Sequence, residues 1–143
     1  MRTVEAHAAF TTGPDRVWEC LADPGRWSEW LVLHKSWKGE PPAAAVEGLN
    51  ATATATAMNM PITIDWTFEK VDAPHELGMS GTTRAGVELR LTITLSAHDT
   101  GTLVAVNAEV DGGMIDGPMG AVFNKSLTGA LDKSLKKLGA LAS

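Results

Sequence analysis

The sequence predicts an α+β fold, with a curved antiparallel sheet of about seven strands, two short helices near the N-terminus and one long helix at the C-terminus. Three observations support this prediction. The middle of the chain alternates apolar and polar residues with period two in several successive segments, which is typical of antiparallel strands with one dry face. Two helix-start signals follow the first strand-like segment. The end of the chain repeats apolar residues every three or four positions, as a helix packed on a sheet does.

The chain begins with a strand over residues 4–10 and continues with two short helices. Thr12, with Pro14 and Asp15 after it, predicts the start of the first helix, because a threonine cap is commonly followed three residues later by an acid. Asp23 and the proline after it predict the start of the second helix.

Three of the five tryptophans lie between residues 18 and 30. Indole rings are large and mostly apolar, with one N–H donor to satisfy. Their clustering therefore predicts an aromatic wall beside an apolar interior. Trp18 is expected in the core. For Trp30 and Trp66, a position in the core and a position in the wall of a pocket are equally compatible with the sequence.

A loop over residues 38–50, with room for one short strand, leads into the main sheet. Five strands are predicted after it, over residues 51–57, 62–69, around 77–79, 87–97 and 102–110. In residues 51–57 the alternating apolar residue is alanine. Its small side chain leaves volume unfilled if this face points inwards, which favours a cavity.

The register of the last two strands can be predicted, because slipping one strand by one residue turns every side chain to the other face. Pairing Leu95 with Val104 keeps the apolar residues of both strands on one face. The same register places Arg90 opposite Glu109 on the wet face, which is a favourable cross-strand pair. The alternative register would bury Glu109, so we reject it.

The final helix is predicted from Pro118 onwards, with Asp116 or Gly117 as its cap. It would be roughly 35 Å long at 1.5 Å per residue. Gly129 in its middle is a weak point, worth about 1 kcal/mol relative to alanine. The lysines of this helix suit its exposed face and the negative end of its dipole.

Composition limits the classes of function. The net charge of −5 argues against nucleic-acid binding, because phosphates need a basic patch. No apolar run approaches the ~20 residues of a membrane span, and the first residues do not resemble a secretory signal. We therefore expect a cytoplasmic protein without membrane insertion. The lone Cys20 excludes an internal disulfide, and the four histidines lack metal-ligand spacing, so neither a metal nor another cofactor is expected.

Residues 17–30 resemble the N-terminal fingerprint of the START-like superfamily, also called SRPBCC, and within it the bacterial polyketide cyclase/dehydrase-like group. Residues 126–138 are similar to the ending of that group. The resemblance covers nearly the whole chain, residues 1–143 as one domain, and implies the helix-grip fold, in which a sheet and a long helix enclose a cavity. It also implies binding of lipids, polyketides or other apolar ligands, although one fold hosts many functions. One branch of such proteins is labelled as the toxin of a toxin–antitoxin pair.

The predicted dry face of the sheet contains no ionisable residue. Acid–base catalysis needs a positioned titratable group, so binding of an apolar or amphipathic small molecule ranks above catalysis. The predicted wall of the ligand site consists of Trp27, Trp30, Met58, Met60, Trp66, Met79, Met114, Met119 and Phe123. Methionines adapt to varied apolar shapes, but they equally fill irregular gaps in any core.

Two other functions are compatible with the sequence. A cyclase or dehydrase would shape a reactive chain inside the pocket, with His34, Asp65 or Arg84 as donor. His34 lies in a predicted loop, where a histidine is usually just solvated, and Asp65 would need a bulge to turn inwards. A toxin-like protein would instead act through its surface, on an antitoxin-like partner or as a homodimer.

Overall fold

The computed structural model describes residues 2–57, 60–84, 86–99, 101–112 and 120–143. Within these ranges the strands are β1 (Arg2–Phe10), β2 (His34–Trp37), β3 (Asn50–Ala57), β4 (Met60–Asp72), β5 (Glu76–Thr83), β6 (Glu88–His98) and β7 (Gly101–Asp111). The helices are α1 (Pro14–Leu21), the short 3-10 helix η1 (Pro24–Arg26), α2 (Trp27–Trp30) and α3 (Gly120–Ala142). The predicted α+β helix-grip architecture is confirmed.

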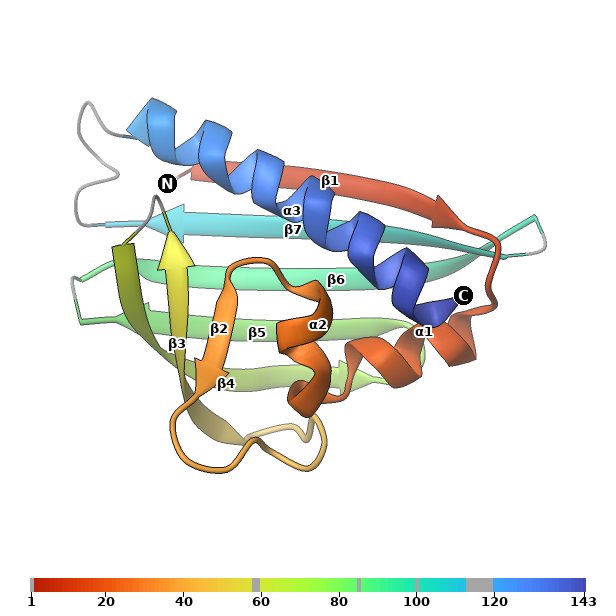
Figure 1. Cartoon of the computed structure of the whole chain (residues 1–143), viewed down its shortest axis with the longest axis horizontal. Helices are drawn as coiled ribbons and strands as arrows, with labels where there is room; N and C mark the ends of the chain where they lie inside the picture. Colours follow the sequence, from red (N-terminus) through yellow and green to blue (C-terminus); the bar gives the residue numbers. More distant parts are fainter. Residues whose placement is uncertain (1, 58–59, 85, 100, 113–119) are drawn as a thin grey trace.

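All of these strands belong to one antiparallel sheet with the order β1-β7-β6-β5-β4-β3-β2. Strands β2 to β7 follow one another as neighbours, and β1 closes the far edge beside β7. The sheet curls, and α1, α2 and α3 lie on the same side of it (Figure 1). The long α3 runs diagonally across β1 and β7, while β2 and β3 stand in front of the rest of the sheet.

The dry face of the sheet contains the residues that the alternation predicts. Ile64, Trp66 and Phe68 of β4 are all buried, with Asp65 exposed between the first two. The predicted register of β6 and β7 is confirmed, with Leu95 opposite Val104 and Arg90 opposite Glu109. Local alternation was sufficient here because only one register keeps both apolar sets together.

Helix α3 presents its apolar stripe to the core, where Leu127, Leu131, Leu135 and Leu138 are buried. The backbone N–H of Val32 donates a hydrogen bond of 2.9 Å to Oγ of Ser134. That hydroxyl donates in turn to the Ala130 carbonyl at 2.8 Å. Two segments far apart in the sequence are thereby joined, and α3 is held against the chain that leaves α2. The residues predicted to begin and cap this helix, Asp116, Gly117 and Pro118, lie outside the described residues.

The start of α1 differs from the prediction. Its N-cap is Gly13, not Thr12, and no side chain caps the helix. The Thr12 carbonyl instead accepts a 2.7 Å hydrogen bond from the hydroxyl of Thr102, which fastens the end of β1 to β7. The second helix start is as predicted, because the Asp23 side chain caps η1 by accepting a hydrogen bond of 3.1 Å from the N–H of Gly25.

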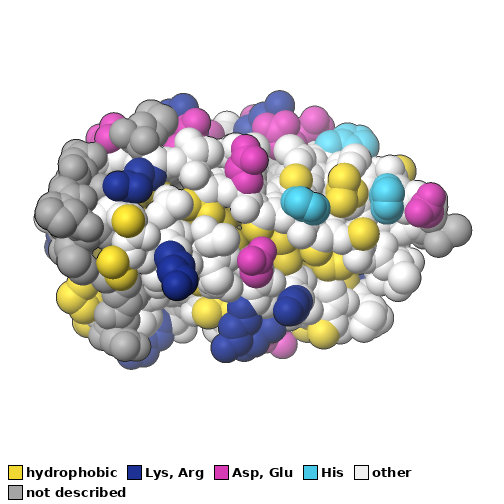
Figure 2. All heavy atoms as spheres, turned by 90° about the horizontal axis from the view of Figure 1, so that it is seen from above, with side chains coloured by type: hydrophobic (Ala, Val, Ile, Leu, Met, Phe, Trp, Pro, Cys, Tyr) yellow, Lys and Arg dark blue, Asp and Glu magenta, His cyan; other side chains and the backbone are white. Residues whose placement is uncertain are grey.

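The surface around α3 is mixed in charge. The four lysines of this helix are exposed, and basic and acidic side chains are interspersed over the face seen from above α3 and β1 (Figure 2). In the part of the chain that the structure describes, no helix has the length and apolar character needed to cross a bilayer. Across the same ranges, no three His, Cys, Asp or Glu side chains are grouped so as to hold a metal ion.

Candidate functional site

A cavity of about 300 Å³ lies between the sheet and α3. Most of its wall is apolar and comes from the segment joining α2 to β2, from four strands and from α3: Leu31, Leu33, Ala55, Ile62, Ile64, Trp66, Leu89, Leu91, Ala108, Val110, Phe123, Leu127 and Leu131. Small-molecule sites are commonly mostly apolar clefts of roughly 300–1,000 Å³. This cavity lies at the lower end of that range.

Small residues on the dry face leave room for the cavity. Ala55 on β3 and Ala108 on β7 are both buried, and both line it. At Ala55, the alanine face of residues 51–57 therefore points towards the interior, which is the arrangement expected to leave a cavity. A larger side chain at either position would project into the same space.

Three of the predicted wall residues line the cavity, namely Met60, Trp66 and Phe123. They come from β4 and α3, so the fold brings together residues that are far apart in the sequence. Met60 is 44% exposed, which places it at the rim. Contact of these residues with a ligand stays a prediction. The other predicted methionines of this region, Met58, Met114 and Met119, lie outside the described residues.

Trp27, Trp30 and Met79 are not among the residues that line this cavity, and their contact with a ligand stays a prediction. All three are almost fully buried in the core. The Trp27 ring packs against Phe68, with centroids 6.0 Å apart, and its Nε1 donates a 3.1 Å hydrogen bond to the Leu21 carbonyl. Large side chains that are enclosed by protein contribute stability to the core.

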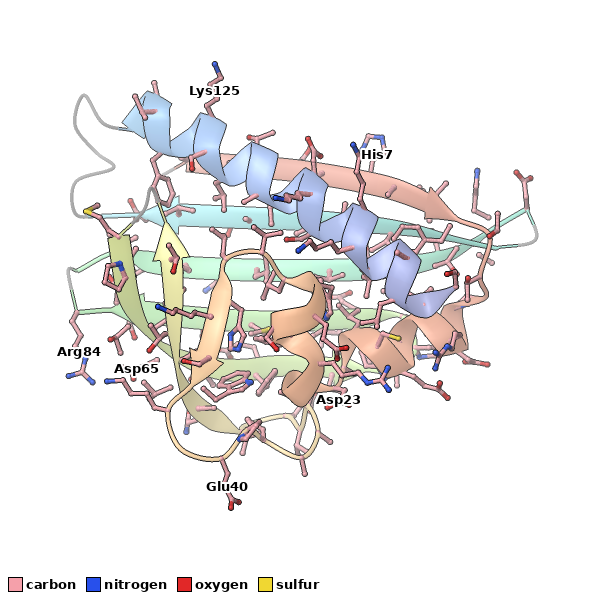
Figure 3. The ribbon with its side chains drawn as sticks, viewed as in Figure 1. His7, Asp23, Glu40, Asp65, Arg84 and Lys125 are labelled. Atoms are coloured by element: carbon pink, nitrogen blue, oxygen red, sulfur yellow. The ribbon has the colours of Figure 1, made fainter. Side chains whose placement is uncertain are left out.

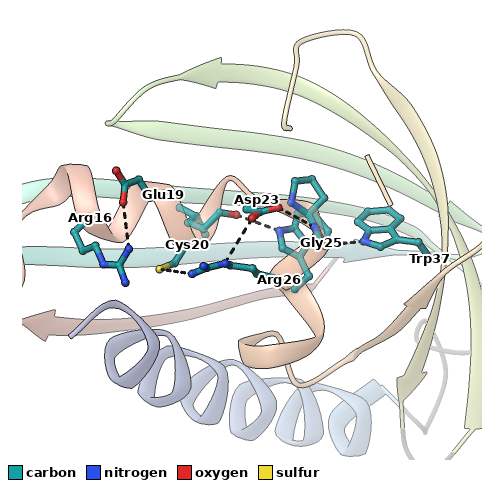
Figure 4. Close-up of polar contacts among 10 residues, drawn as sticks. Arg16, Glu19, Cys20, Asp23, Gly25, Arg26 and Trp37 are labelled. Carbon is teal, nitrogen blue, oxygen red and sulfur yellow. Dashed lines mark hydrogen bonds and ion pairs between the residues drawn. The ribbon is translucent and has the colours of Figure 1, made fainter. Parts of the chain in front are cut away.

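A polar network holds the α1–η1 corner behind this core (Figure 4). Arg26 lies 3.6 Å from the Asp23 carboxylate and also donates to Sγ of the buried Cys20 at 3.8 Å. Nε1 of Trp37 donates a 2.7 Å hydrogen bond to the Pro24 carbonyl. This network joins the helical corner to β2, and so it helps to position His34, the residue of β2 that lines the cavity.

His34 is the site residue that the sequence analysis placed wrongly. It lies on β2 and not in a loop, is 9% exposed and lines the cavity. Its ring lies edge-on to Trp27, with centroids 5.8 Å apart, and beside Trp37 at 4.9 Å. Burial lowers the pKa of His34 below 6.5, so the imidazole is neutral at pH 7.

The signal for β2 is weak in the sequence. The strand has only four residues, and its register with β3 shifts between His34 and Ser36. An irregularity of this kind interrupts the alternation on which strand prediction depends. The nearby Trp37 was the usable clue, since tryptophan is highly buried on average.

The other predicted donors lie away from the cavity. Asp65 is exposed on the outer face of β4 and accepts a 2.7 Å hydrogen bond from the Thr52 hydroxyl. Arg84 points away from the protein (Figure 3). Arg90 and Glu109 border the cavity and also a groove on the opposite face of the sheet, where alternation directs their side chains. Among the described residues, His34 is therefore the titratable residue whose side chain forms part of the cavity wall.

The whole chain, residues 1–143, matches the family described as polyketide cyclase/dehydrase and lipid transport. The chain belongs to this family. The match agrees with the observed curled sheet and closing helix. It agrees as well with the resemblance seen in residues 17–30.

Two relatives and one solved structure are similar to this chain. The uncharacterized protein Rv1546 of Mycobacterium tuberculosis H37Rv is 30% identical over 141 residues, which cover 99% of each chain. Toxin Rv0910 of the same strain is 25% identical over 123 residues, covering 86% of this chain and 85% of that protein. The crystal structure of TTHA0849 from Thermus thermophilus has a TM-score of 0.78 at 18% identity and covers 99% of this chain and 97% of its own.

Proposed function

We propose that this protein binds an apolar or amphipathic small molecule in the cavity between the sheet and α3, and that it does so in the cytoplasm. The observation that supports this proposal is the hollow itself, about 300 Å³ with an almost wholly apolar wall. A dry apolar cavity of about 150 Å³ is large enough for benzene. Twice that volume suits a two-ring aromatic or a chain of about twelve carbons.

Apolar burial would supply most of the affinity, at roughly 25 cal/mol per Å². Asp65 and Arg84 lie outside the cavity, and Arg90 and Glu109, which border it, direct their side chains to the opposite face of the sheet. The described wall therefore lacks the convergent charged groups that position a substrate for acid–base chemistry. Binding therefore fits the wall better than a reaction does.

Fluorescence titration with naphthalene tests this proposal, together with native mass spectrometry of the protein purified from its source. We expect saturable one-to-one binding by the wild type. Ala55→Leu should weaken binding at least tenfold, because Ala55 lines the cavity. Thr54→Leu, on the other face of the same strand, is the matched control and should leave binding unchanged. Failure of the wild type to bind naphthalene or to retain any ligand would refute the proposal.

A cyclase or dehydrase activity is the second candidate. The family description favours it, and His34 supplies a neutral imidazole at the cavity wall. In that case a polyketide-type substrate should turn over with the wild type and fail with His34→Gln. Equal turnover by the variant would exclude His34 as the donor.

A toxin-like role has one observation in its favour, the relative named Toxin Rv0910. Such a protein would act through its surface on a protein partner or as a homodimer. Induced expression should then arrest growth, and the cavity-filling Ala55→Leu variant should arrest growth equally. Normal growth on induction would refute this role.

A further inference from the structure

His34 is a polar side chain set into an otherwise apolar wall. Its imidazole lines the cavity at 9% exposure. The rings of Trp27, nearly perpendicular to the imidazole, and of Trp37 pack against it. Among the described residues, none makes a hydrogen bond with either ring nitrogen of His34.

Neither ring nitrogen is among the side-chain atoms that are fully enclosed without a partner, so the imidazole is open to a hydrogen bond from a molecule in the cavity. A neutral imidazole offers one N–H donor and one nitrogen acceptor, and a hydroxyl group can satisfy either. Two threonines, Thr56 and Thr83, also line the cavity. Thr83 already accepts a hydrogen bond of 3.1 Å at its Oγ1 from the N–H of Val87.

The same surroundings select against a charged ligand group. Leu31 and Leu33 precede His34 in the chain and Ala55 is its cross-strand partner; all three line the cavity, and none of them can compensate a buried carboxylate. Desolvating an ion against a neutral imidazole and aliphatic carbon is strongly unfavourable. An uncharged hydroxyl loses far less on entering the same site.

We propose that His34 is the specificity-determining residue of this cavity and selects apolar ligands of about two-ring size that carry an uncharged hydroxyl group, which hydrogen-bonds to the imidazole. The proposal rests on the proposed binding function and names the ligand class. It assigns no chemical step to His34.

The test compares naphthalene, 2-naphthol and 2-naphthoate as probes of wild type, His34→Phe and His34→Gln. Phenylalanine keeps the aromatic packing and removes the hydrogen bond, whereas glutamine keeps a hydrogen-bonding group. The ratio of the naphthalene Kd to the 2-naphthol Kd should fall about fivefold from wild type to His34→Phe, as the net value of one hydrogen bond implies. His34→Gln should recover part of this ratio, and 2-naphthoate should bind the wild type more weakly than 2-naphthol.

A measurement on the wild type alone keeps the proposal testable if His34→Phe fails to fold. The ¹⁵N shifts of the His34 ring should move when 2-naphthol is added and stay nearly constant with naphthalene. If naphthalene binds but neither the Kd ratio nor the ring shifts respond to the hydroxyl, the role of His34 is refuted while the binding function stands. Tighter binding of 2-naphthoate than of 2-naphthol would refute it too. If neither naphthalene nor 2-naphthol binds the wild type, both proposals fall.

Discussion

Gly81 on β5 leaves the space that the indole of Trp66 on β4 occupies. The two residues are cross-strand partners, and a Cβ at Gly81 would lie 2.8 Å from Cε3 of Trp66 and 2.8 Å from Cγ2 of Ile64. Both of those side chains line the cavity. The missing side chain at Gly81 therefore helps to determine the shape of the cavity wall.

Gly81→Ala is expected to lower the free energy of unfolding by about 1–3 kcal/mol, the usual cost of overpacking. It should also weaken naphthalene binding, because Trp66 has to move. Urea unfolding and fluorescence titration measure the two effects. Gly78→Ala on the same strand is the control, since its Cβ would meet Lys70 at an ordinary 3.4 Å. Equal losses in the two variants would contradict this account.

Gly129 in the middle of α3 and Gly139 near its C-terminal end should respond differently to alanine. A Cβ at Gly129 meets nothing within 4 Å, so Gly129→Ala should stabilise the protein by about 1 kcal/mol through helix propensity. A Cβ at Gly139 would lie 2.8 Å from Cε1 of Phe10, and Gly139→Ala should bring no gain. Thermal unfolding compares the two, and an equal rise in Tm would show that Phe10 does not restrict Gly139.

The buried tryptophans of α2 differ in their hydrogen bonds. Nε1 of Trp27 donates to the Leu21 carbonyl, whereas Nε1 of Trp30 is buried without a partner among the described residues. Trp27→Phe should therefore cost about 1 kcal/mol more in unfolding free energy than Trp30→Phe, the net value of one hydrogen bond. Urea unfolding of both variants checks the difference, and a larger loss for Trp30→Phe would contradict it.

The pH dependence of stability should reveal the burial of His34. Its pKa in the folded protein is below 6.5, so the unfolded chain takes up a proton first as the pH falls. Above pH 6.5 both states are neutral and the group contributes no pH dependence. Below 6.5 stability decreases until the folded pKa is reached, and the loss is then complete.

His34→Gln removes this titration. Between about pH 7.5 and pH 5 the wild type should lose more unfolding free energy than the variant. Urea unfolding at several pH values measures both curves. Parallel curves would mean that His34 is as accessible in the folded protein as in the unfolded chain.

The sequence by itself determined the strands other than β2, the register of β6 and β7, and the closing helix of this protein. Alternation of apolar and polar residues identifies the dry face of β4 and β6, and only one register pairs Leu95 with Val104. These are local properties, since a side chain's face in a strand follows from its position along the chain. Trp66 could be predicted to face inwards for the same reason, and Phe123 could be predicted from the helical repeat of apolar residues at the end of the chain.

Only the tertiary structure decided which buried residues surround the cavity and which fill the core. Trp27 and Trp66 are both apolar, aromatic and buried, yet only Trp66 lines the cavity. The difference arises from the curl of the sheet and from where α2 and α3 pack on it. The position of His34 in the cavity wall was also decided by the tertiary structure. β2 has only four residues and an irregular register, so the burial of its side chains depends on the neighbouring elements and not on the pattern of its own sequence.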